Sequence, residues 1–521
     1  MKEIKDNIWK EAEKDVIFHN INGKEKLSIA ESCVDRHASE IPNKLAFVFE
    51  FENEHIVNYT YKELQVEINK FANYLDKIGI KKRARVFIFL PKIPETYISF
   101  LAVLKHGSIS APLFEAFQTD GLELRLERGD ADVLITNKEL AERLHHKPNT
   151  MKIIIIDSPE FKNEIKKMSD KFDAVLLDKD DTMIMMFTSS TAGTPVAGIE
   201  TPNYALVQQH YSAKLVLDLK KEDRYFCTAH PGWVTGAIYG IIAPLSIGCT
   251  NYVYVSHFDA KHWINFIKKN KISVIYTAPT ALRLLRSEIK KDDLKLIRNL
   301  CSVGEALTGT VFEDYKKLGV LINDTYWQTE TGAMVIANWR ELRKKKNSIG
   351  KALPGINAAI KDGVIVLKPG WPAMMTGIYK HEQMYKDYFK DGYFITNDLA
   401  KQDKEGYFFF IGRKDDIIKV SGERISPIEV ESFLMKHRAV REAAVIGIPD
   451  AIKGSVLKAF IVLNKDFENK GDDKLKNELM DFVKQNYAGH SYPKVIEFVS
   501  NLPKTNSGKI IRMKLREMER K

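Results

Sequence analysis

The stretch MIMMFTSSTAGTPVAGIETP, residues 183–202, joins an apolar run to a loop rich in Gly, Ser and Thr. The apolar run is typical of a buried strand, and Thr201 followed by Pro202 is a typical helix start with Thr201 as the N-cap. A strand that runs through such a loop into a helix presents backbone N–H groups and hydroxyls to phosphate oxygens. The sequence therefore predicts a phosphate-binding loop followed by a helix from Pro202.

This loop has the glycine spacing of a Walker loop but lacks its lysine. Gly193 and Gly198 are spaced as GxxxxG, yet Ile199 and Glu200 stand where a Walker loop has Lys and Ser or Thr. The loop is therefore not a Walker loop, and its composition alone is more typical of a plain turn.

Outward from this loop, helical periodicity alternates with short apolar strands between about residues 60 and 330. One helix face carries Leu64, Ile68, Phe71 and Leu75, and the strand VFIFL (86–90) follows. This alternation predicts an α/β fold with parallel sheets covered by helices on both faces. Turn-punctuated strands over about 360–412 predict a small β-barrel-like unit within an N-terminal domain of residues 1–414. Residues 415–521 then predict a small α+β domain, with a domain boundary at Asp415.

Composition restricts the partners and the location. The chain has 521 residues with 79 Lys+Arg against 69 Asp+Glu, and its basic residues are interspersed with acids. A polyphosphate ligand fits this balance, whereas nucleic acid and a membrane surface are not expected as partners. No apolar run approaches the roughly 18 residues that span a bilayer, and the charged N-terminus lacks a secretory signal. A cytoplasmic location is expected. The four cysteines lie far apart, which favours free thiols over a zinc site or disulfides.

Ordered motifs along nearly the whole chain identify a family. They are YTAPT (276–280), SVGEAL (302–307), DTYWQTETG (324–332), TNDLA (396–400), GRKDDIIKVSGERISPIEVE (412–431) and LPKTNSGKIIR (502–512). Their order and spacing resemble the adenylate-forming synthetases. Within that superfamily, PLFEAF (112–117), HPGWVTG (230–236) and KPGWPAMM (368–375) resemble the AMP-forming acetyl-CoA synthetases.

The resemblance implies two chemical steps with acetate, ATP and CoA as substrates and Mg²⁺ as cofactor. A carboxylate attacks the α-phosphorus of ATP to give acyl-AMP and pyrophosphate, and the CoA thiol then displaces AMP. Lys509 matches the lysine that binds the reacting carboxylate and α-phosphate, and family likeness makes its acylation a plausible regulatory switch. Glu330 matches the magnesium-associated glutamate, because a hard cation prefers carboxylate oxygen, and Thr329 beside it can donate to phosphate.

The resemblance also implies a nucleotide site. Asp398 matches the ribose-binding aspartate, since an ionised carboxylate can accept hydrogen bonds from both ribose hydroxyls. Arg413 and Arg424 match arginines near the ribose and phosphates, where a guanidinium offers forked donors. The remaining predicted ATP- and AMP-binding residues are Thr188, Ser189, Ser190, Thr191, Gly193, Gly304, Glu305, Ala306, Asp324, Thr325, Tyr326, Trp327 and Gln328. Of these, Gly304, Glu305 and the segment DTYW (324–327) match the family's adenine pocket, where Tyr326 offers the face of its ring.

An acyl pocket and a CoA path complete the expected site. Trp327 matches a tryptophan that closes the pocket in acetyl-specific relatives, and Trp233, Val234 and Thr235 match its other walls. An indole there leaves room for a methyl or ethyl group, so propionate is expected to be a poorer substrate rather than an excluded one. Asp415 matches the family's hinge, and the resemblance implies that the small, mobile C-terminal domain rotates between the two steps, which removes Lys509 and forms a CoA tunnel. Gly422 matches a residue of this tunnel whose lack of a side chain lets pantetheine pass.

Arg125 roughly matches a basic contact to the CoA nucleotide, but the interpretation that the pattern favours is a solvated helix arginine.

The phosphate loop departs from the family form TSGSTGxPKG. Ser190 replaces a glycine, Ala192 a Ser or Thr, Val196 the lysine and Ala197 a glycine. Losing one charge-assisted contact to pyrophosphate corresponds to about 1.5–3 kcal/mol. Acetate activation with weakened ATP handling is the favoured hypothesis. Two alternatives stay open: another short-chain acyl-CoA synthetase, for example one for propionate, and a homologue that binds nucleotide or acyl-adenylate without efficient turnover.

Overall fold

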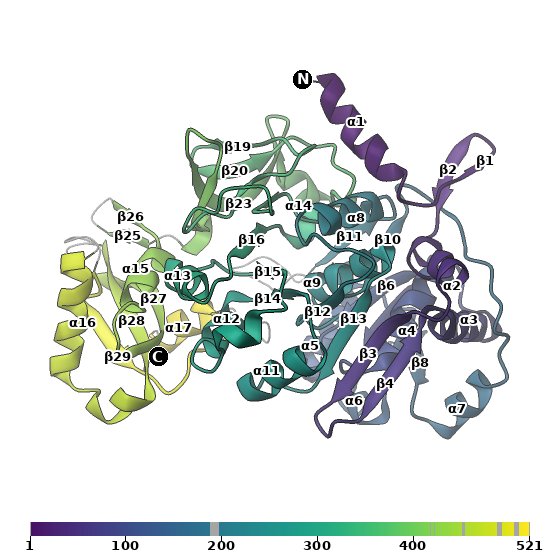
Figure 1. Cartoon of the computed structure of the whole chain (residues 1–521), viewed down its shortest axis with the longest axis horizontal. Coiled ribbons are helices and arrows are strands. Elements are labelled where there is room, and N and C mark those ends of the chain that lie inside the picture. Colours follow the sequence, from purple (N-terminus) through teal and green to yellow (C-terminus); the bar gives the residue numbers. More distant parts are fainter. Residues whose placement is uncertain are drawn as a thin grey trace.

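Two large sheets, a small antiparallel sheet and a C-terminal α+β unit form most of the molecule (Figure 1). A further three-stranded sheet contains β1 (His19–Ile21), β2 (Lys24–Leu27) and β9 (Leu177–Asp178). The computed structural model describes residues 2–148, 150–187, 197–416, 418–420, 423–450, 454–486, 492–504 and 510–519.

The first sheet has a parallel centre and two antiparallel strands at one edge. Strands β10, β6, β5, β7 and β8 pair in parallel, and β11 and β21 extend the sheet in antiparallel fashion. In pairing order the strands are β21 (Gly377–Ile378), β11 (Gly198–Pro202), β10 (Thr182–Phe187), β6 (Ile109–Leu113), β5 (Arg85–Phe89), β7 (Val133–Thr136) and β8 (Lys152–Ile155).

The prediction that a helix starts at Pro202 is wrong. Residues Gly198–Pro202 form β11, antiparallel to β10, and the helix α8 (Ala205–Leu215) begins three residues later than predicted. One side of β10 already pairs with β6, so its other side needs partners for its N–H and C=O groups, and the returning chain supplies them. A Cβ on Gly198 would lie 2.6 Å from Met185 Cγ, so only glycine fits this close pairing. The Ser/Thr-rich loop therefore joins two antiparallel strands.

The second sheet is parallel from β16 to β3, with antiparallel strands at both edges. In pairing order it contains β18 (Lys351–Ala352), β17 (Ile336–Ala337), β16 (Ile322–Tyr326), β15 (Asn299–Ser302), β14 (Val274–Thr277), β12 (Arg224–Cys227), β13 (Thr250–Val255), β3 (Leu45–Phe51) and β4 (Ile56–Thr60).

Helices cover both faces of these sheets, as the alternating pattern predicted. One continuous apolar core lies between the sheets and includes residues of α3 (Tyr61–Lys77), α4 (Pro94–Lys105), α8 and α10 (Ala243–Ile247). On the outer faces, α5 (Thr119–Arg128) packs on the first sheet, and α11 (Ala260–Lys269), α12 (Pro279–Leu285) and α13 (Gly309–Lys317) pack on the second. The α/β class with parallel sheets is confirmed.

The predicted barrel-like unit is a five-stranded antiparallel sheet. Its strands are β19 (Ala358–Lys361), β20 (Val364–Leu367), β22 (Phe389–Lys390), β23 (Tyr393–Gln402) and β24 (Phe408–Arg413), and the short helix α14 (Glu382–Asp387) precedes β22. The pairing of β20 with β23 shifts register between Val364 and Val366, which marks a bulge in this sheet.

The C-terminal unit, at the left of Figure 1, has apolar clusters of its own. It contains β25 (Ile418–Val420), β26 (Glu423–Ile425), α15 (Pro427–Leu434), β27 (Val440–Asp450), β28 (Gly454–Leu463), α16 (Asp473–Asn486), β29 (Val495–Phe498) and α17 (Arg512–Met518). Asp415 lies in the 3-10 turn Lys414–Asp416 that connects β24 to this unit. The domain boundary at this turn stays a prediction.

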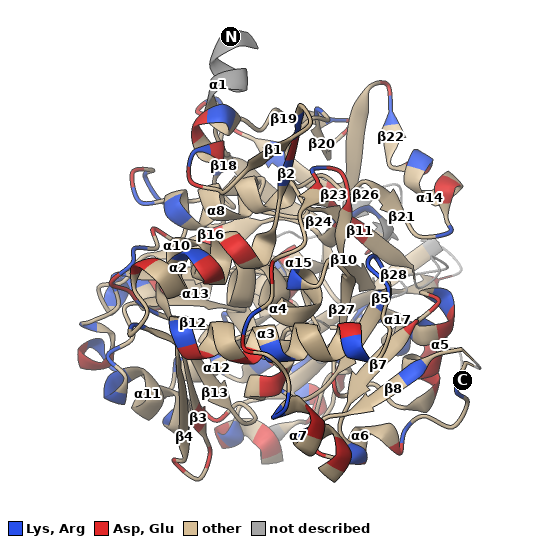
Figure 2. Ribbon diagram, turned by 90° about the vertical axis from the view of Figure 1, so that its right-hand side faces the viewer, with Lys and Arg blue, Asp and Glu red and all other residues tan. Residues whose placement is uncertain are grey.

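Charges of both signs alternate along the helices and turns in Figure 2, as expected for a chain whose basic residues are interspersed with acids. None of the helices in the described ranges combines the length and the apolar character that crossing a membrane requires.

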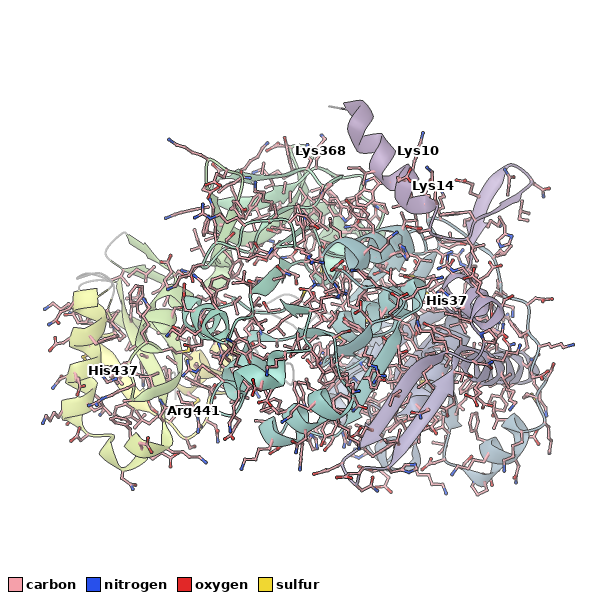
Figure 3. All side chains as sticks on the ribbon, viewed as in Figure 1. Lys10, Lys14, His37, Lys368, His437 and Arg441 are labelled. Carbon is pink, nitrogen blue, oxygen red and sulfur yellow. The ribbon has the colours of Figure 1, made fainter. Side chains whose placement is uncertain are left out.

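Three buried histidines are expected to make the fold acid-sensitive. Burial lowers the pKa of His37 (labelled in Figure 3), His106 and His210 from 6.5 to about 4. The unfolded chain binds these protons at higher pH than the folded chain. The contribution of these histidines to the free energy of unfolding is therefore largest above about pH 6.5, and it is lost as the pH drops towards 4. We expect a loss of about 1–3 kcal/mol for each histidine.

Guanidinium unfolding at several pH values between about 7.5 and 4 measures this loss. The variant His106→Gln has one such histidine fewer, so its free energy of unfolding should fall less steeply over the same range. Equal slopes for the variant and the wild type would contradict the assignment to His106.

Candidate active site

A cavity of about 560 Å³ opens at the carboxyl ends of the strands of both sheets. Many of its lining residues lie at or just after the carboxyl ends of β5, β6, β12, β13, β14 and β15. This is the edge at which open α/β sheets bind their ligands. The volume suits a small-molecule ligand. Trp233 and Thr235, predicted for the acyl pocket, line it together with Gly304 and Glu305, predicted for the adenine pocket. The structure thus brings the two predicted subsites into one cavity.

Three charged or titratable residues in the cavity wall were missed by the sequence analysis. His230 Nδ1 accepts a hydrogen bond of 2.8 Å from the Gly232 N–H, and its Nε2 pairs with the Glu115 carboxylate. Burial alone would raise the pKa of Glu115, but the interaction with His230, a backbone hydrogen bond and the charge of Lys92 together outweigh burial and lower that pKa. Burial lowers the pKa of Lys92 to about 8, although the charge of Glu115 opposes this shift.

The segments PLFEAF and HPGWVTG meet at this wall. A Cβ on Gly232 would lie 2.4 Å from the Phe114 backbone N, so the close approach requires glycine there. Phe114 in turn contacts Trp233 with ring centroids 5.5 Å apart. The pairing of Glu115 with His230 joins the same two segments. Both residues belong to quoted motifs, and a titratable side chain in each motif was the signal available in the sequence.

Trp327 lies behind the cavity wall and supports it. Its Nε1 donates to the Tyr276 hydroxyl at 3.1 Å, and its ring packs edge-on against Tyr239 with centroids 5.0 Å apart. Tyr276 lines the cavity, so Trp327 contacts the lining directly. Val234 begins the short helix α9 (Val234–Ala237), but it is not part of the lining that the described residues form.

A second cluster gathers the predicted nucleotide-binding residues at the seam between β16 and the antiparallel sheet. The Tyr326 hydroxyl donates to Asp398 Oδ2 at 2.8 Å, and Gln328 Nε2 donates to the same oxygen at 2.7 Å. Arg413 Nε lies 3.7 Å from Asp398 Oδ1. Tyr326 and Gln328 lie about 70 positions before Asp398 in the chain, and the fold brings them, together with Arg413, to its carboxylate.

Glu330 is close to this cluster and has a partner that the sequence did not reveal. The Tyr388 hydroxyl, from the chain before β22, donates to Glu330 Oε1 at 2.9 Å. Burial raises the pKa of Glu330, and this hydrogen bond partly opposes the shift. Thr329 precedes Glu330 in the 3-10 turn Thr329–Thr331. No local pattern marks Tyr388, because its role depends on contact with a distant segment.

The side chains of Asp324 and Thr325 bond within the protein. Asp324 accepts a hydrogen bond of 2.5 Å from Ser302 Oγ, and burial raises the pKa of Asp324 to about 7. Thr325 Oγ1 bonds to the Tyr276 hydroxyl at 2.8 Å. Glu305, at the cavity, accepts from the Thr280 N–H at 3.0 Å. Ala306 follows it, half-buried.

Arg125 is neither solvated nor in the cavity lining of the described chain. Its side chain is only 8% exposed, its guanidinium lies 3.8 Å from the centroid of the Phe117 ring, and Nη1 donates to the Gly121 carbonyl at 2.7 Å. The reading as a solvated helix arginine is therefore wrong, because the aromatic ring covers the cation.

Several predicted site residues lie outside the described residues: Thr188, Ser189, Ser190, Thr191, Gly193, Gly422 and Lys509. For Asp415 and Arg424 the structure describes the backbone but not the side chain.

Comparison with known proteins places this site in a family. Residues 34–370 match the AMP-binding enzyme model, and residues 429–509 match the model of the AMP-binding enzyme C-terminal domain. The crystal structure of an anthranilate CoA ligase in complex with anthranoyl-AMP is similar, with a TM-score of 0.83 and 26% identity, over 95% of this chain and 97% of that chain. The crystal structure of a Brucella canis acyl-CoA synthetase is also similar, with a TM-score of 0.76 and 30% identity, over 99% of this chain and 98% of that chain.

The chain belongs to the AMP-binding enzyme family. Among its relatives, the acetyl-coenzyme A synthetase of Bacillus subtilis is 40% identical over 95% of this chain and 91% of its own length. The acetyl-coenzyme A synthetase of Methanothrix thermoacetophila is 36% identical over 94% of this chain and 82% of its own length.

Proposed function

We propose that this chain is an AMP-forming acetate–CoA ligase. In the first step an acetate oxygen attacks the α-phosphorus of ATP, and pyrophosphate leaves with the electrons of the broken P–O bond. In the second step the CoA sulfur attacks the acetyl carbonyl, the thiol proton is lost, and AMP departs. Relatives named acetyl-coenzyme A synthetase, matched over 82–91% of their own length, support this assignment.

The observation that carries the proposal is the shared cavity. Trp233 and Thr235 line the same space as Gly304 and Glu305, so an acyl group and a nucleotide can meet there. Asp398, held by Tyr326 and Gln328, offers a buried carboxylate of the kind that accepts hydrogen bonds from ribose hydroxyls.

Mg²⁺ fits the side chains at the phosphate end of this site. Among the described residues no group of three or more His, Cys, Asp or Glu could hold a metal ion, and Mg²⁺ in nucleotide enzymes is held by one or two carboxylates together with substrate phosphates. Glu330 is the carboxylate that would hold it, and Tyr388 orients that carboxylate. When bound, the ion would neutralise charge on the phosphate oxygens.

Acetate-dependent exchange of labelled pyrophosphate into ATP tests the adenylation step. We expect exchange that needs acetate, together with acetyl-CoA formation when CoA is added. Nucleotide binding without exchange would favour the alternative of a binding homologue. A cytoplasmic location and acylation of Lys509 belong to this proposal as predictions from the sequence.

The size of the acid should be set by Trp327. Its indole stands against Tyr239 and Tyr276, so replacement by glycine should open space next to the cavity. In the wild type we expect kcat/KM to fall by about 10- to 200-fold for each added methylene from acetate to propionate to butyrate. In Trp327→Gly we expect the order to reverse towards the longer acids.

Initial rates with the three acids measure this preference. Trp339→Gly, at a partly buried tryptophan outside the cavity lining, controls for loss of an indole in general. A wild-type preference for butyrate would overturn the role of Trp327.

A further inference from the structure

The Asp398 carboxylate is held by side-chain donors of the protein itself. Tyr326 and Gln328 both donate to Oδ2, at 2.8 and 2.7 Å. Asp398 is 6% exposed and Tyr326 is 8% exposed, so these bonds form where little water competes. Hydrogen bonds to an ionised carboxylate are short and strong, and two of them on one oxygen restrict rotation of the group.

The backbone conformation around Asp398 orients its side chain towards the residues at the end of β16. Asn397, just before it, has φ 59°, a left-handed conformation that asparagine tolerates better than most residues. The register shift between β20 and β23 falls at the same place, and such bulges redirect side chains near active sites. The Asp398 N–H donates to Thr396 Oγ1 at 3.1 Å. The antiparallel sheet therefore fixes the backbone of Asp398, while Tyr326 at the end of β16 and Gln328 just after it fix its carboxylate.

The Tyr326 hydroxyl stays protonated and can therefore always donate its hydrogen bond to Asp398. Burial, reinforced by the negative charge of Asp398, raises the pKa of Tyr326 well above its ordinary value, so the hydroxyl keeps its proton at any physiological pH. The Tyr326 ring packs against Phe410 with centroids 6.3 Å apart, which holds the phenol in place. Gln328 Nε2 also donates to the Thr396 carbonyl at 2.9 Å. Both donors are thus themselves anchored.

We propose that Tyr326 is a positioning residue whose hydroxyl fixes Asp398 in the orientation that accepts the ribose cis-diol, and that it thereby sets the preference for ribonucleotides over 2′-deoxyribonucleotides. The inference rests on the proposed nucleotide-binding role of Asp398. It gives the Tyr326 hydroxyl a task separate from any contact of its ring with adenine.

Tyr326→Phe keeps the ring and removes the hydroxyl. The carboxylate of Asp398 then retains Gln328 but can rotate, so its bonds to the ribose hydroxyls should weaken. We expect AMP to bind about tenfold more weakly, and 2′-deoxy-AMP about twofold more weakly, because the deoxynucleotide lacks one of the hydroxyls that depend on the carboxylate. The preference for AMP should therefore shrink about fivefold.

Calorimetric titration of the full chain with AMP and with 2′-deoxy-AMP measures both affinities without turnover. Tyr315→Phe is the matched control: it removes another buried tyrosine hydroxyl, bonded to the Leu282 carbonyl at 3.1 Å in the outer core, and should leave the ratio of affinities unchanged. Gln328→Met removes the second donor to Oδ2 and should shift the ratio in the same direction as Tyr326→Phe. It serves as the test if the tyrosine variant does not fold.

An equal loss of affinity for both nucleotides in Tyr326→Phe, or an unchanged ratio, would overturn the inference. A wild type without any preference for AMP would overturn it as well. Failure of the proposed function looks different: the wild type would bind AMP with the expected preference but would show no acetate-dependent exchange. In steady-state assays the substitution Tyr326→Phe should raise the KM for ATP about tenfold, while kcat should change less than about threefold.

Discussion

Replacing Lys509 by alanine should lower acetate-dependent ATP–pyrophosphate exchange by about 10²- to 10³-fold. The motif LPKTNSGKIIR implies that this ammonium meets the reacting carboxylate and the α-phosphate, where negative charge is rearranged in the transition state. Removing one such charge-stabilising donor from an enzyme site typically has an effect of this size. Exchange of labelled pyrophosphate at saturating acetate measures it.

The same variant should form acetyl-CoA from synthetic acetyl-AMP at a rate close to wild type. The family resemblance implies that the C-terminal unit withdraws this lysine before CoA attacks, so only the first step depends on it. Lys514→Ala, at an exposed lysine of α17, is the matched control and should not alter exchange. Equal loss in both steps, or normal exchange in Lys509→Ala, would contradict the assignment.

Replacing Asp398 by asparagine should lower kcat/KM for ATP by about 100-fold, mainly through KM. An amide has one acceptor oxygen, so its NH₂ group must face either Gln328 Nε2 or the Arg413 guanidinium, both of which are donors. The variant also loses the charge that strengthens hydrogen bonds to ribose, and the combined loss corresponds to about 2–3 kcal/mol.

Calorimetry with AMP checks this binding loss directly. Asp403→Asn, in the turn that joins β23 and β24, makes the same chemical change at the far end of the hairpin and should leave AMP binding unchanged. Wild-type affinity in Asp398→Asn would remove Asp398 from the nucleotide site.

Much of the fold could be predicted because its helices and strands are locally encoded. The apolar spacing from Leu64 to Leu75 predicted a helix, and the structure has α3 over Tyr61–Lys77. The apolar run VFIFL became β5, and the turn-rich stretch after residue 360 became the antiparallel sheet. In each case the period of buried side chains matches the element that buries them.

The helix predicted from Thr201 and Pro202 failed because a local signal competed with a non-local need. Thr-Pro is a valid helix start, but β10 had one unpaired side, and residues 198–202 satisfied it as β11. The hydrogen bonds of a sheet edge depend on which strands surround it, and no window of sequence contains that information.

The site divides in the same way. The motifs identified Asp398, Glu330 and Tyr326 because each stands within a recognisable segment. Tyr388 and the pair Glu115–His230 were missed, because their partners lie 58 and 115 positions away in the chain.

The sequence by itself determined the residue types that this chemistry requires and their order along the chain. Only the tertiary structure decided that the Tyr326 hydroxyl meets Asp398, 72 residues later, and that acyl-pocket and adenine-pocket residues share one cavity. The physical reason is that a side-chain hydrogen bond forms only within about 3 Å, and such proximity arises where two sheets meet rather than from any local pattern.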